Sequence, residues 1–208
     1  MGLMDKLPKT CSVILAQYTD FWGLKSNAMP KDYCFISNIK YIEDNILRTF
    51  YKLQICKHAR VSYTNGSTPS LSKTMGTLLS SVNEYRQIVG ALQYITLTRP
   101  DITFSFNKLA QFMHCATTEH WHACKCLLRY LRQTSSHGLL LQRDSSFVLH
   151  CYSDSDWAGC PNDRRSTGGY LIYLGTNLVS WSSKKQPTVA RSSTESEYKA
   201  LATRQHNG

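Results

Sequence analysis

The chain has 208 residues, a length that allows one full domain or two small ones. Hydrophobic residues make up 42% of the chain and charged residues 18%, a composition that excludes global disorder and favours a packed core. Lys and Arg number 24 against 14 Asp and Glu, and this net charge of +10 favours polyanionic partners. Because no block of like charge occurs, the positive charge is expected on folded surfaces and not on a tail.

The cysteines and the N-terminal residues indicate where the protein resides. The apolar stretch 11–16 is shorter than the hydrophobic region of a secretory signal, so we predict that the chain is not secreted. No apolar run approaches the roughly 18 residues of a membrane span. We therefore predict an intracellular protein, cytoplasmic or nuclear, whose 8 cysteines are free thiols and which has no membrane partner.

The first third of the chain has a weak structural pattern. Residues 1–76 mix short apolar runs with Gly, Pro, Asn and Ser, and helical spacing of apolar residues is clear at 39–53. Residues 66–81 are rich in Ser, Thr, Gly and Pro and predict a linker. We treat 1–76 as a first, poorly defined unit.

Three amphipathic helices are predicted within residues 77–136. We expect Asn83 to cap the first helix, Pro100 to begin the second, and Thr117 or Thr118 to cap the third. The apolar residues at helical spacing are Tyr85, Ile88, Val89, Leu92, Ile95, Ile102, Phe106, Leu109, Ala110, Met113, Trp121, Cys124, Leu127, Leu128 and Leu131. Their spacing predicts a compact helical unit with a shared core.

From residue 137 onward the pattern becomes extended. The short apolar runs 138–141, 147–153, 169–174 and 178–182 are separated by turn signals and predict a meander of antiparallel strands. Thr194 is then expected to cap a helix. The predicted fold class is α+β, and strands followed by one helix resemble the front of a larger domain.

Two carboxylates in this last unit could hold a metal ion. Asp154 lies at the end of the run 147–153, and Glu197 lies in the first turn of the helix that follows the strands. A strand-borne Asp facing a helix-borne Glu suits hard divalent cations, which prefer oxygen ligands. The residues alone leave another interpretation open, in which Asp154 is a turn residue and Glu197 stabilises the helix dipole.

Two long stretches resemble one family. Residues 152–201 (YSDSDWAGCPNDRRSTGGYLIYLGTNLVSWSSKKQPTVARSSTESEYKAL) resemble the opening of the ribonuclease H domain of copia-type retrotransposon Pol polyproteins. Residues 85–141 (YRQIVGALQYITLTRPDITFSFNKLAQFMHCATTEHWHACKCLLRYLRQTSSHGLLL) resemble the segment that joins the reverse transcriptase palm to that domain. Residues 39–48 (IKYIEDNILR) resemble the stretch just upstream in such polyproteins.

The resemblance implies an arrangement of units along the chain. Residues 1–76 would contain the end of a reverse transcriptase palm, and 77–136 a helical connection region. Residues 137–208 would form a truncated ribonuclease H-like domain, with a three-stranded antiparallel meander and its first helix.

The resemblance also implies a metal site. The family's ribonuclease H site uses four carboxylates to hold two Mg²⁺ ions about 3.5–4 Å apart, which hydrolyse the RNA of an RNA/DNA hybrid. By position in the motif, Asp154 matches the Asp of the first strand, and Glu197 in the triplet SEY matches the Glu of the first helix. The other two carboxylates are expected beyond Gly208, so we expect this chain to be inactive by itself.

The polymerase site of the family has no good match. Its members carry a Tyr-Val-Asp-Asp string on a hairpin, whereas Tyr41-Ile-Glu-Asp44 has Glu where Asp is expected and begins a helical pattern. No reverse transcription is therefore expected from this chain.

Basic residues are candidates for nucleic-acid contact. They lie on the third predicted helix, in a turn between strands and after the last strand: Lys125, Arg129, Arg132, Arg164, Arg165, Lys184 and Lys185. Such residues would suit the phosphates of an RNA/DNA hybrid, in contacts that are independent of base sequence. The alternative is surface charge that only keeps the protein in solution.

A group of His and Cys residues at 114–126 has the chemistry of zinc ligands without their usual spacing. On a predicted helix the C-x-C and H-x-H pairs point apart, and His120 with Cys124 is the one well-placed pair. We interpret these residues as buried Cys and surface His.

Three functional hypotheses remain open. The first is a degenerate fragment of a retrotransposon reverse transcriptase and ribonuclease H polyprotein, whose ancestral role is hydrolysis of RNA in RNA/DNA hybrids. The second is a non-enzymatic, basic nucleic-acid-binding protein. The third is a relic reading frame that gives no stable protein.

Overall fold

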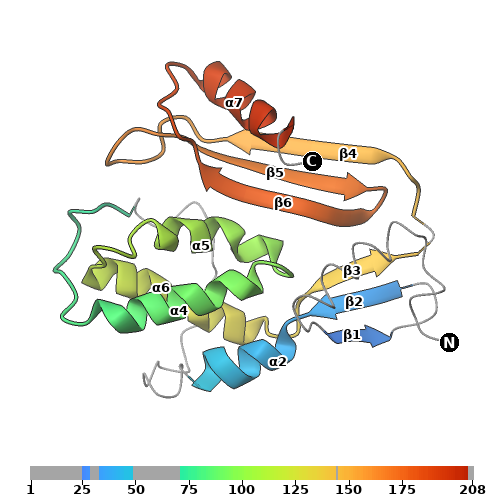
Figure 1. Cartoon of the computed structure of the whole chain (residues 1–208), viewed down its shortest axis with the longest axis horizontal. Helices are drawn as coiled ribbons and strands as arrows, with labels where there is room; N and C mark the ends of the chain where they lie inside the picture. The colour runs from blue at the N-terminus through green and yellow to red at the C-terminus, as the bar shows by residue number, and fades with distance from the viewer. Residues whose placement is uncertain (1–24, 29–32, 49–70, 144, 206–208) are drawn as a thin grey trace.

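The computed structural model describes residues 25–28, 33–48, 71–143 and 145–205 (Figure 1). The described part combines helices with two antiparallel sheets of three strands each, which confirms the predicted α+β class. Within these residues no helix is long and apolar enough to cross a membrane.

The first sheet brings together segments that lie far apart in the sequence. Its order is β1 (Lys25–Ala28), β2 (Tyr33–Ser37) and β3 (Leu139–Gln142), with β2 antiparallel to both neighbours. Sequence reasoning placed residues 138–141 in the meander with the later strands, and this pairing is wrong. The side chains of Cys34, Ile36, Leu139 and Leu141 are buried together, because alternate residues of β2 and β3 face the same side.

A short helical segment follows β2 directly. It consists of α2 (Ile39–Tyr41) and one π-helical turn, η2 (Ile42–Leu47). The predicted helix is thus confirmed for its first part, and the Tyr41–Asp44 string is helical instead of a hairpin. Residues 49–53 of that prediction lie outside the described residues, as does 66–70 of the predicted linker. Ile42 and Ile46 are buried against the helices that come later in the chain.

The main core lies among the helices that follow. These are α4 (Val82–Ile95), the 3-10 turn η3 (Pro100–Ile102), α5 (Thr103–Ala110) and α6 (Thr118–Gln133). The predicted apolar faces are confirmed, and the fully or nearly fully buried residues among them are Tyr85, Ile88, Val89, Leu92, Ile95, Ile102, Leu109, Cys124, Leu127, Leu128 and Leu131. Each buried aliphatic side chain contributes about 1.5–3 kcal/mol.

The starts of these helices differ in part from the predicted ones. Ser81, with extended backbone, precedes α4 and takes the cap position expected for Asn83. Thr117 caps α6 as predicted. Its backbone N–H donates to Nδ1 of His120, and its hydroxyl is hydrogen-bonded to the same nitrogen, in a reciprocal capping arrangement.

The second sheet is a meander covered by the last helix. Its strands β4 (Leu149–Ser155), β5 (Thr167–Leu174) and β6 (Asn177–Lys185) pair antiparallel in chain order. Gly175 has φ of +60° in the turn from β5 to β6, a conformation that favours glycine. Helix α7 (Ser193–Gln205) packs on β4 and β5. The predicted order of three antiparallel strands and one helix is therefore present.

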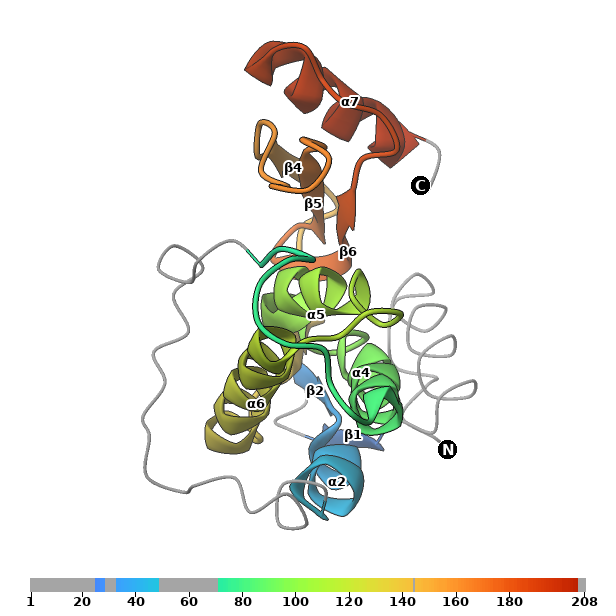
Figure 2. The same cartoon turned by 90° about the vertical axis from the view of Figure 1, so that its left-hand side faces the viewer.

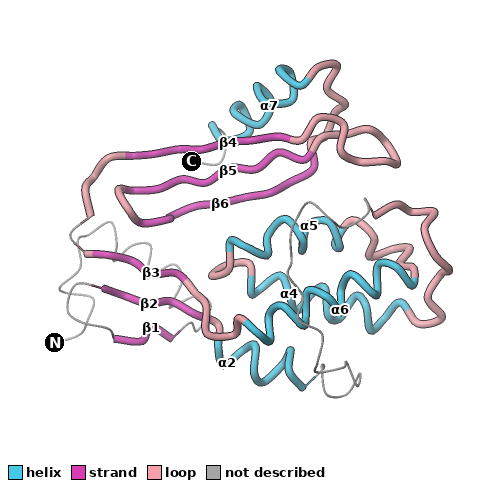
Figure 3. Tube along the Cα trace, turned by 180° about the vertical axis from the view of Figure 1, so that it is seen from behind, coloured by secondary structure: helices cyan, strands magenta, loops and turns pink. Residues whose placement is uncertain are grey.

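The second sheet lies between two helical layers. Figure 2 shows α7 on one side of it and α5, with α4 and α6 beyond, on the other, and α5 packs against β6. The indole N–H of Trp181 donates to the carbonyl of Thr96 at 3.0 Å. The side chain of Asn177 bonds the backbone N–H and carbonyl of Gln142 at 2.7 and 2.9 Å, which joins the two sheets seen from behind in Figure 3.

Candidate functional site

The register of β4 decides which way Asp154 points. Asp154 pairs with Gly169 and Ser155 pairs with Gly168, so Asp154 and Gly168 lie on opposite faces of the sheet. The face of Gly168 is the one that α7 covers, because a Cβ on Gly168 would lie 3.2 Å from the Cβ of Ala200. Asp154 therefore projects from the other face, toward α5.

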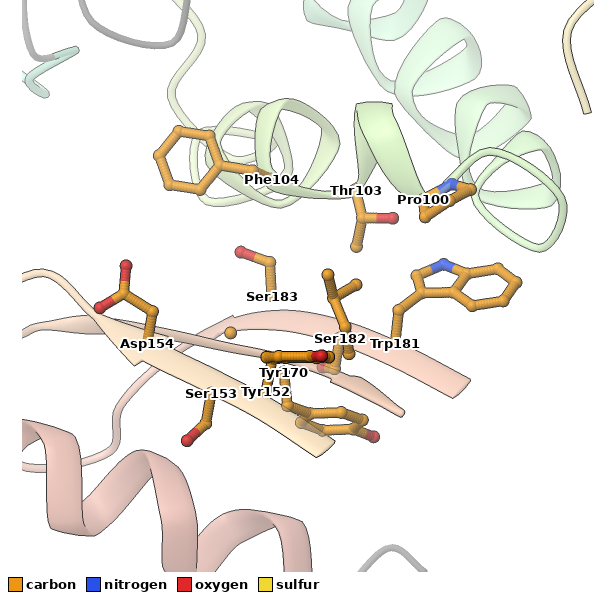
Figure 4. Close-up of a pocket in the computed structure, with 12 residues that line it drawn as sticks. Pro100, Thr103, Phe104, Tyr152, Ser153, Asp154, Tyr170, Trp181, Ser182 and Ser183 are labelled. Carbon is orange, nitrogen blue, oxygen red and sulfur yellow. The ribbon is translucent and has the colours of Figure 1, made fainter. Parts of the chain in front are cut away.

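A cavity of about 280 Å³ lies between α5 and this face of the sheet. Its lining includes Pro100 and Phe104 from the helical side and Gly169 and Trp181 from the strands, with Asp154 as the one carboxylate among the lining residues. In Figure 4, Asp154 and Trp181 project from the sheet on the side of Phe104. An acidic group thus stands beside a cavity whose lining combines aromatic side chains with serine and threonine hydroxyls.

The two aspartates at the end of β4 have different roles. Asp154 is exposed, its Oδ1 accepts the N–H of Ser155 at 2.8 Å, and it makes no ion pair within the described residues. The carboxylate of Asp156 instead accepts the N–H of Thr167, and the N–H of Asp156 donates to the Thr167 carbonyl at 3.1 Å. A side chain at Gly159 would collide with the Asp156 carboxylate. Asp156 therefore stabilises the connection between β4 and β5, whereas the carboxylate of Asp154 bonds only its neighbour Ser155 among the described residues.

The two glutamates at the start of α7 also differ in their contacts. The Glu195 carboxylate accepts the N–H of Arg191 at 2.7 Å and pairs with Lys199 at 2.7 Å, and these contacts, the Lys199 bond first, lower its pKa. Ser192 accepts the N–H of Glu195 at 3.1 Å, so Ser192 caps α7 and the predicted cap Thr194 is wrong. Glu197 is exposed and makes no ion pair within the described residues.

Asp154 and Glu197 approach the second sheet from opposite sides. Among residues 193–202 of α7, Ser196 and Ala200 are buried. The carbonyl of Ser196 accepts a hydrogen bond from the side chain of Gln186 at 2.8 Å. Within the described residues β4 is an outer strand of this sheet. Among the described residues, no group of three or more His, Cys, Asp or Glu side chains is arranged to hold a metal ion.

Two of the predicted basic residues form ion pairs with Asp163. Lys185 and Arg165 pair with Asp163 at 2.8 and 3.6 Å, and Lys185 also lies 3.0 Å from the sulfur of Cys160. Partial burial would raise the pKa of Asp163, but the hydrogen bonds, first that of Lys185, lower it to about 2. Arg164 and Lys184 are exposed nearby.

The other predicted basic residues lie on α6, within the helical layer. The Lys125 ammonium sits 5.4 Å from the centre of the Trp121 ring, and Arg129 donates to the sulfur of Cys126 at 3.4 Å. Arg132 lies in the last turn of the same helix. The predicted phosphate contacts of these basic residues stay a prediction.

The His and Cys residues of α6 have structural roles. His120 is fully buried, accepts the N–H of Thr117 at Nδ1, and stacks on Phe112 with ring centres 3.9 Å apart. Burial lowers the pKa of His120. Cys124 is buried in the core, which raises its pKa to about 12. The interpretation as buried Cys holds for Cys124, but His120 is not at the surface as expected.

Sequence reasoning missed the helical wall of the cavity. Phe104 is half-buried and lies off the apolar face assigned to its helix. An aromatic residue outside the main apolar face of a helix indicates a second contact surface. The position of Phe104 could therefore have predicted that α5 packs against the second sheet.

Comparison with known proteins decides the family. The chain is 45% identical to the retrovirus-related Pol polyprotein from transposon RE1 of Arabidopsis thaliana over 182 residues, or 88% of this chain and 12% of that polyprotein. It is 40% identical over 187 residues to the uncharacterized mitochondrial protein AtMg00810 of the same plant, a match that covers 88% of this chain and 73% of the relative. The chain belongs to the Pol polyproteins of copia-type retrotransposons.

This membership confirms the family predicted from residues 85–141 and 152–201. The Pol polyprotein from transposon RE2 of Arabidopsis thaliana is 43% identical, and the chain again spans 12% of its length. No protein-family model and no solved structure matches the chain. The domain boundaries and the intracellular location stay predictions for this Pol fragment.

Proposed function

We propose that residues 149–205 form the first part of a ribonuclease H-like unit, in which Asp154 and Glu197 are ligands for Mg²⁺. The observation that carries the proposal is the contrast between neighbouring carboxylates. The carboxylates of Asp156 and Glu195 accept N–H groups from residues farther along or back in the chain, those of Thr167 and Arg191. The carboxylate of Asp154 instead accepts the N–H of its neighbour Ser155, and within the described residues neither Asp154 nor Glu197 makes an ion pair. Membership in the Pol family supports the assignment.

The donor chemistry of the two residues fits Mg²⁺, which prefers carboxylate oxygens and keeps several waters. When bound, the ions of such a site activate water and stabilise the leaving oxygen of a phosphodiester. Asp154 and Glu197 would hold and orient the ion at the edge of β4. The proposed substrate is the RNA strand of an RNA/DNA hybrid, and the exposed residues Arg164 and Lys184 would contact its phosphates.

This chain by itself is proposed to be inactive. The proposed site contains two carboxylates, whereas the family site uses four, and the loss of members of a cooperative catalytic unit removes several orders of magnitude of rate. The helical Tyr41–Asp44 segment likewise does not supply a polymerase hairpin.

A cleavage assay tests this proposal. The purified 208-residue chain is incubated with an end-labelled RNA/DNA hybrid and Mg²⁺ or Mn²⁺. We expect no cleavage above that of the Asp154→Asn variant, which serves as the matched control. Cleavage by the wild-type chain that Asp154→Asn abolishes would contradict the claim of inactivity.

A further inference from the structure

A thiol, an ammonium group and a carboxylate meet at one end of the second sheet. Nζ of Lys185, the last residue of β6, donates to Sγ of Cys160 at 3.0 Å and pairs with Asp163 at 2.8 Å. The carboxylate of Asp163 is also hydrogen-bonded to the Cys160 thiol. Cys160 is 2% exposed, whereas the side chains of Lys185 and Asp163 reach the surface. This thiol–amine cluster contains neither of the two proposed Mg²⁺ ligands.

Backbone hydrogen bonds hold both partners of the nitrogen–sulfur contact in place. The N–H of Cys160 donates to the carbonyl of Arg165 at 3.2 Å, and the N–H of Arg164 donates to the carbonyl of Cys160 at 2.9 Å. Lys185 is paired with Thr167 in the register of β5 and β6. Two groups held about 3–3.5 Å apart react with a high effective concentration. The contact therefore has the geometry from which a bond between the two side chains can form.

We propose that Cys160 and Lys185 form a covalent modification site, which hydrogen peroxide converts into a sulfenamide. In the first step the sulfur attacks the peroxide, the O–O bond breaks, and the thiol becomes a sulfenic acid with release of one water. Lys185 gives its third ammonium proton to solvent, and the neutral amine attacks the same sulfur. An N–S bond then forms, the S–O bond breaks, and the hydroxyl leaves with an amine proton as a second water. The pair has lost two hydrogen atoms, and the peroxide has been reduced to two waters.

The modification would change both the stability and the charge of this end of the sheet. The new bond connects the segment between β4 and β5 to the end of β6, and such a cross-link reduces the freedom of the unfolded chain. It also replaces the ammonium of Lys185 by a neutral nitrogen, which leaves Asp163 paired with Arg165. The modified chain is therefore expected to unfold at a higher urea concentration. This proposal does not depend on metal binding or on ribonuclease H chemistry.

Peptide mass mapping of the peroxide-treated full chain tests the proposal. Burial would lower the pKa of Lys185, but its hydrogen bonds with Asp163 and Cys160 raise it, so the reaction is run at mildly alkaline pH to increase the neutral amine. Trypsin cuts on both sides of 144–164, and a modified Lys185 leaves 185–191 uncut. The expected product joins these two peptides with the loss of two hydrogen atoms, and dithiothreitol is expected to separate them again. A Cys151→Ser background leaves Cys160 as the one thiol of peptide 144–164.

Two lysine variants show whether the amine is the reacting group. Lys185→Arg keeps a positive charge beside Asp163 but offers a guanidinium that stays protonated. It is expected to lose the linked product and to accumulate the sulfenic acid of Cys160, which dimedone traps. Lys199→Arg, the same change at another ion-paired lysine, is expected to leave the yield unchanged. The proposal is overturned if Cys160 of the wild-type chain resists peroxide or stops at the sulfenic acid. A linked product that retains oxygen, or that still forms in Lys185→Arg, would overturn it as well.

Discussion

At the scale of single residues, the buried side chain of Arg99 makes four hydrogen bonds to two residues. The side chain is 1% exposed. Its guanidinium donates to both carboxylate oxygens of Asp101 at 2.9 and 2.7 Å. It also donates to the carbonyl and the hydroxyl of Thr134, both at 2.7 Å. Tyr130 donates to Asp101 as well, at 2.8 Å. These bonds tie the end of α4 to the end of α6.

Asp101→Asn is expected to lower the free energy of unfolding by about 2 kcal/mol, because it leaves the buried Arg99 cation without its counter-charge. Urea unfolding measures this change. Asp163→Asn is the matched control, because Asp163 also forms ion pairs but at the surface, and is expected to cost less than about 1 kcal/mol. Equal effects of the two substitutions would contradict the structural role of Arg99.

The pH dependence of this pair has a definite sign. Partial burial raises the pKa of Asp101, but the hydrogen bonds from Arg99 and Tyr130 outweigh burial and lower it. The ionised carboxylate therefore stabilises the fold above its unfolded pKa of about 3.9, and this stabilisation is lost as the pH falls through the lowered folded value. The difference in stability between wild type and Asp101→Asn is expected to shrink below pH 4 or so.

At the scale of elements, the space around two glycines decides whether a substitution by alanine stabilises or destabilises the fold. Gly90 lies inside α4, and a Cβ there would meet nothing within 4 Å. Gly138 precedes β3, and a Cβ there would collide with the carbonyl of Ile36 on β2. The first glycine weakens its helix, whereas the second allows two strands to approach.

Gly90→Ala is expected to raise the free energy of unfolding by about 0.5–1 kcal/mol, because it removes backbone freedom from the unfolded chain without a clash. Gly138→Ala, the same chemical change, is expected to destabilise the protein by more than about 1 kcal/mol. Thermal and urea unfolding measure both. A destabilising Gly90→Ala would show that the environment of α4 is described wrongly.

The same elements show what could be predicted from sequence. The faces of α4 and α6 follow from apolar spacing over several turns, which is a strong local signal. The run 138–141 gives no such signal, because four apolar residues do not specify a partner, and its partner β2 lies about a hundred residues earlier. The motif predicts Asp154 and Glu197 as site residues, and this stays a prediction. The different hydrogen bonding of Asp154 and Asp156 depends on contacts across a turn that apolar patterns do not encode.

At the scale of the whole molecule, the second sheet separates the two proposed ligands. Asp154 projects toward α5, Glu197 is carried by α7 on the other face, and β4 forms the edge around which they could meet. The central claim is therefore that one divalent ion binds at this edge and uses both carboxylates.

Paramagnetic broadening by Mn²⁺ tests that claim most directly, because it reports position without requiring catalysis. In the uniformly labelled full chain, amide signals around Asp154 and Glu197 are expected to broaden together at low Mn²⁺ concentrations. Asp154→Asn and Glu197→Gln should each abolish the effect at both segments, whereas Glu195→Gln, the same chemical change two residues earlier in α7, should not. Broadening confined to one segment, or broadening that survives Asp154→Asn, would contradict a shared ion.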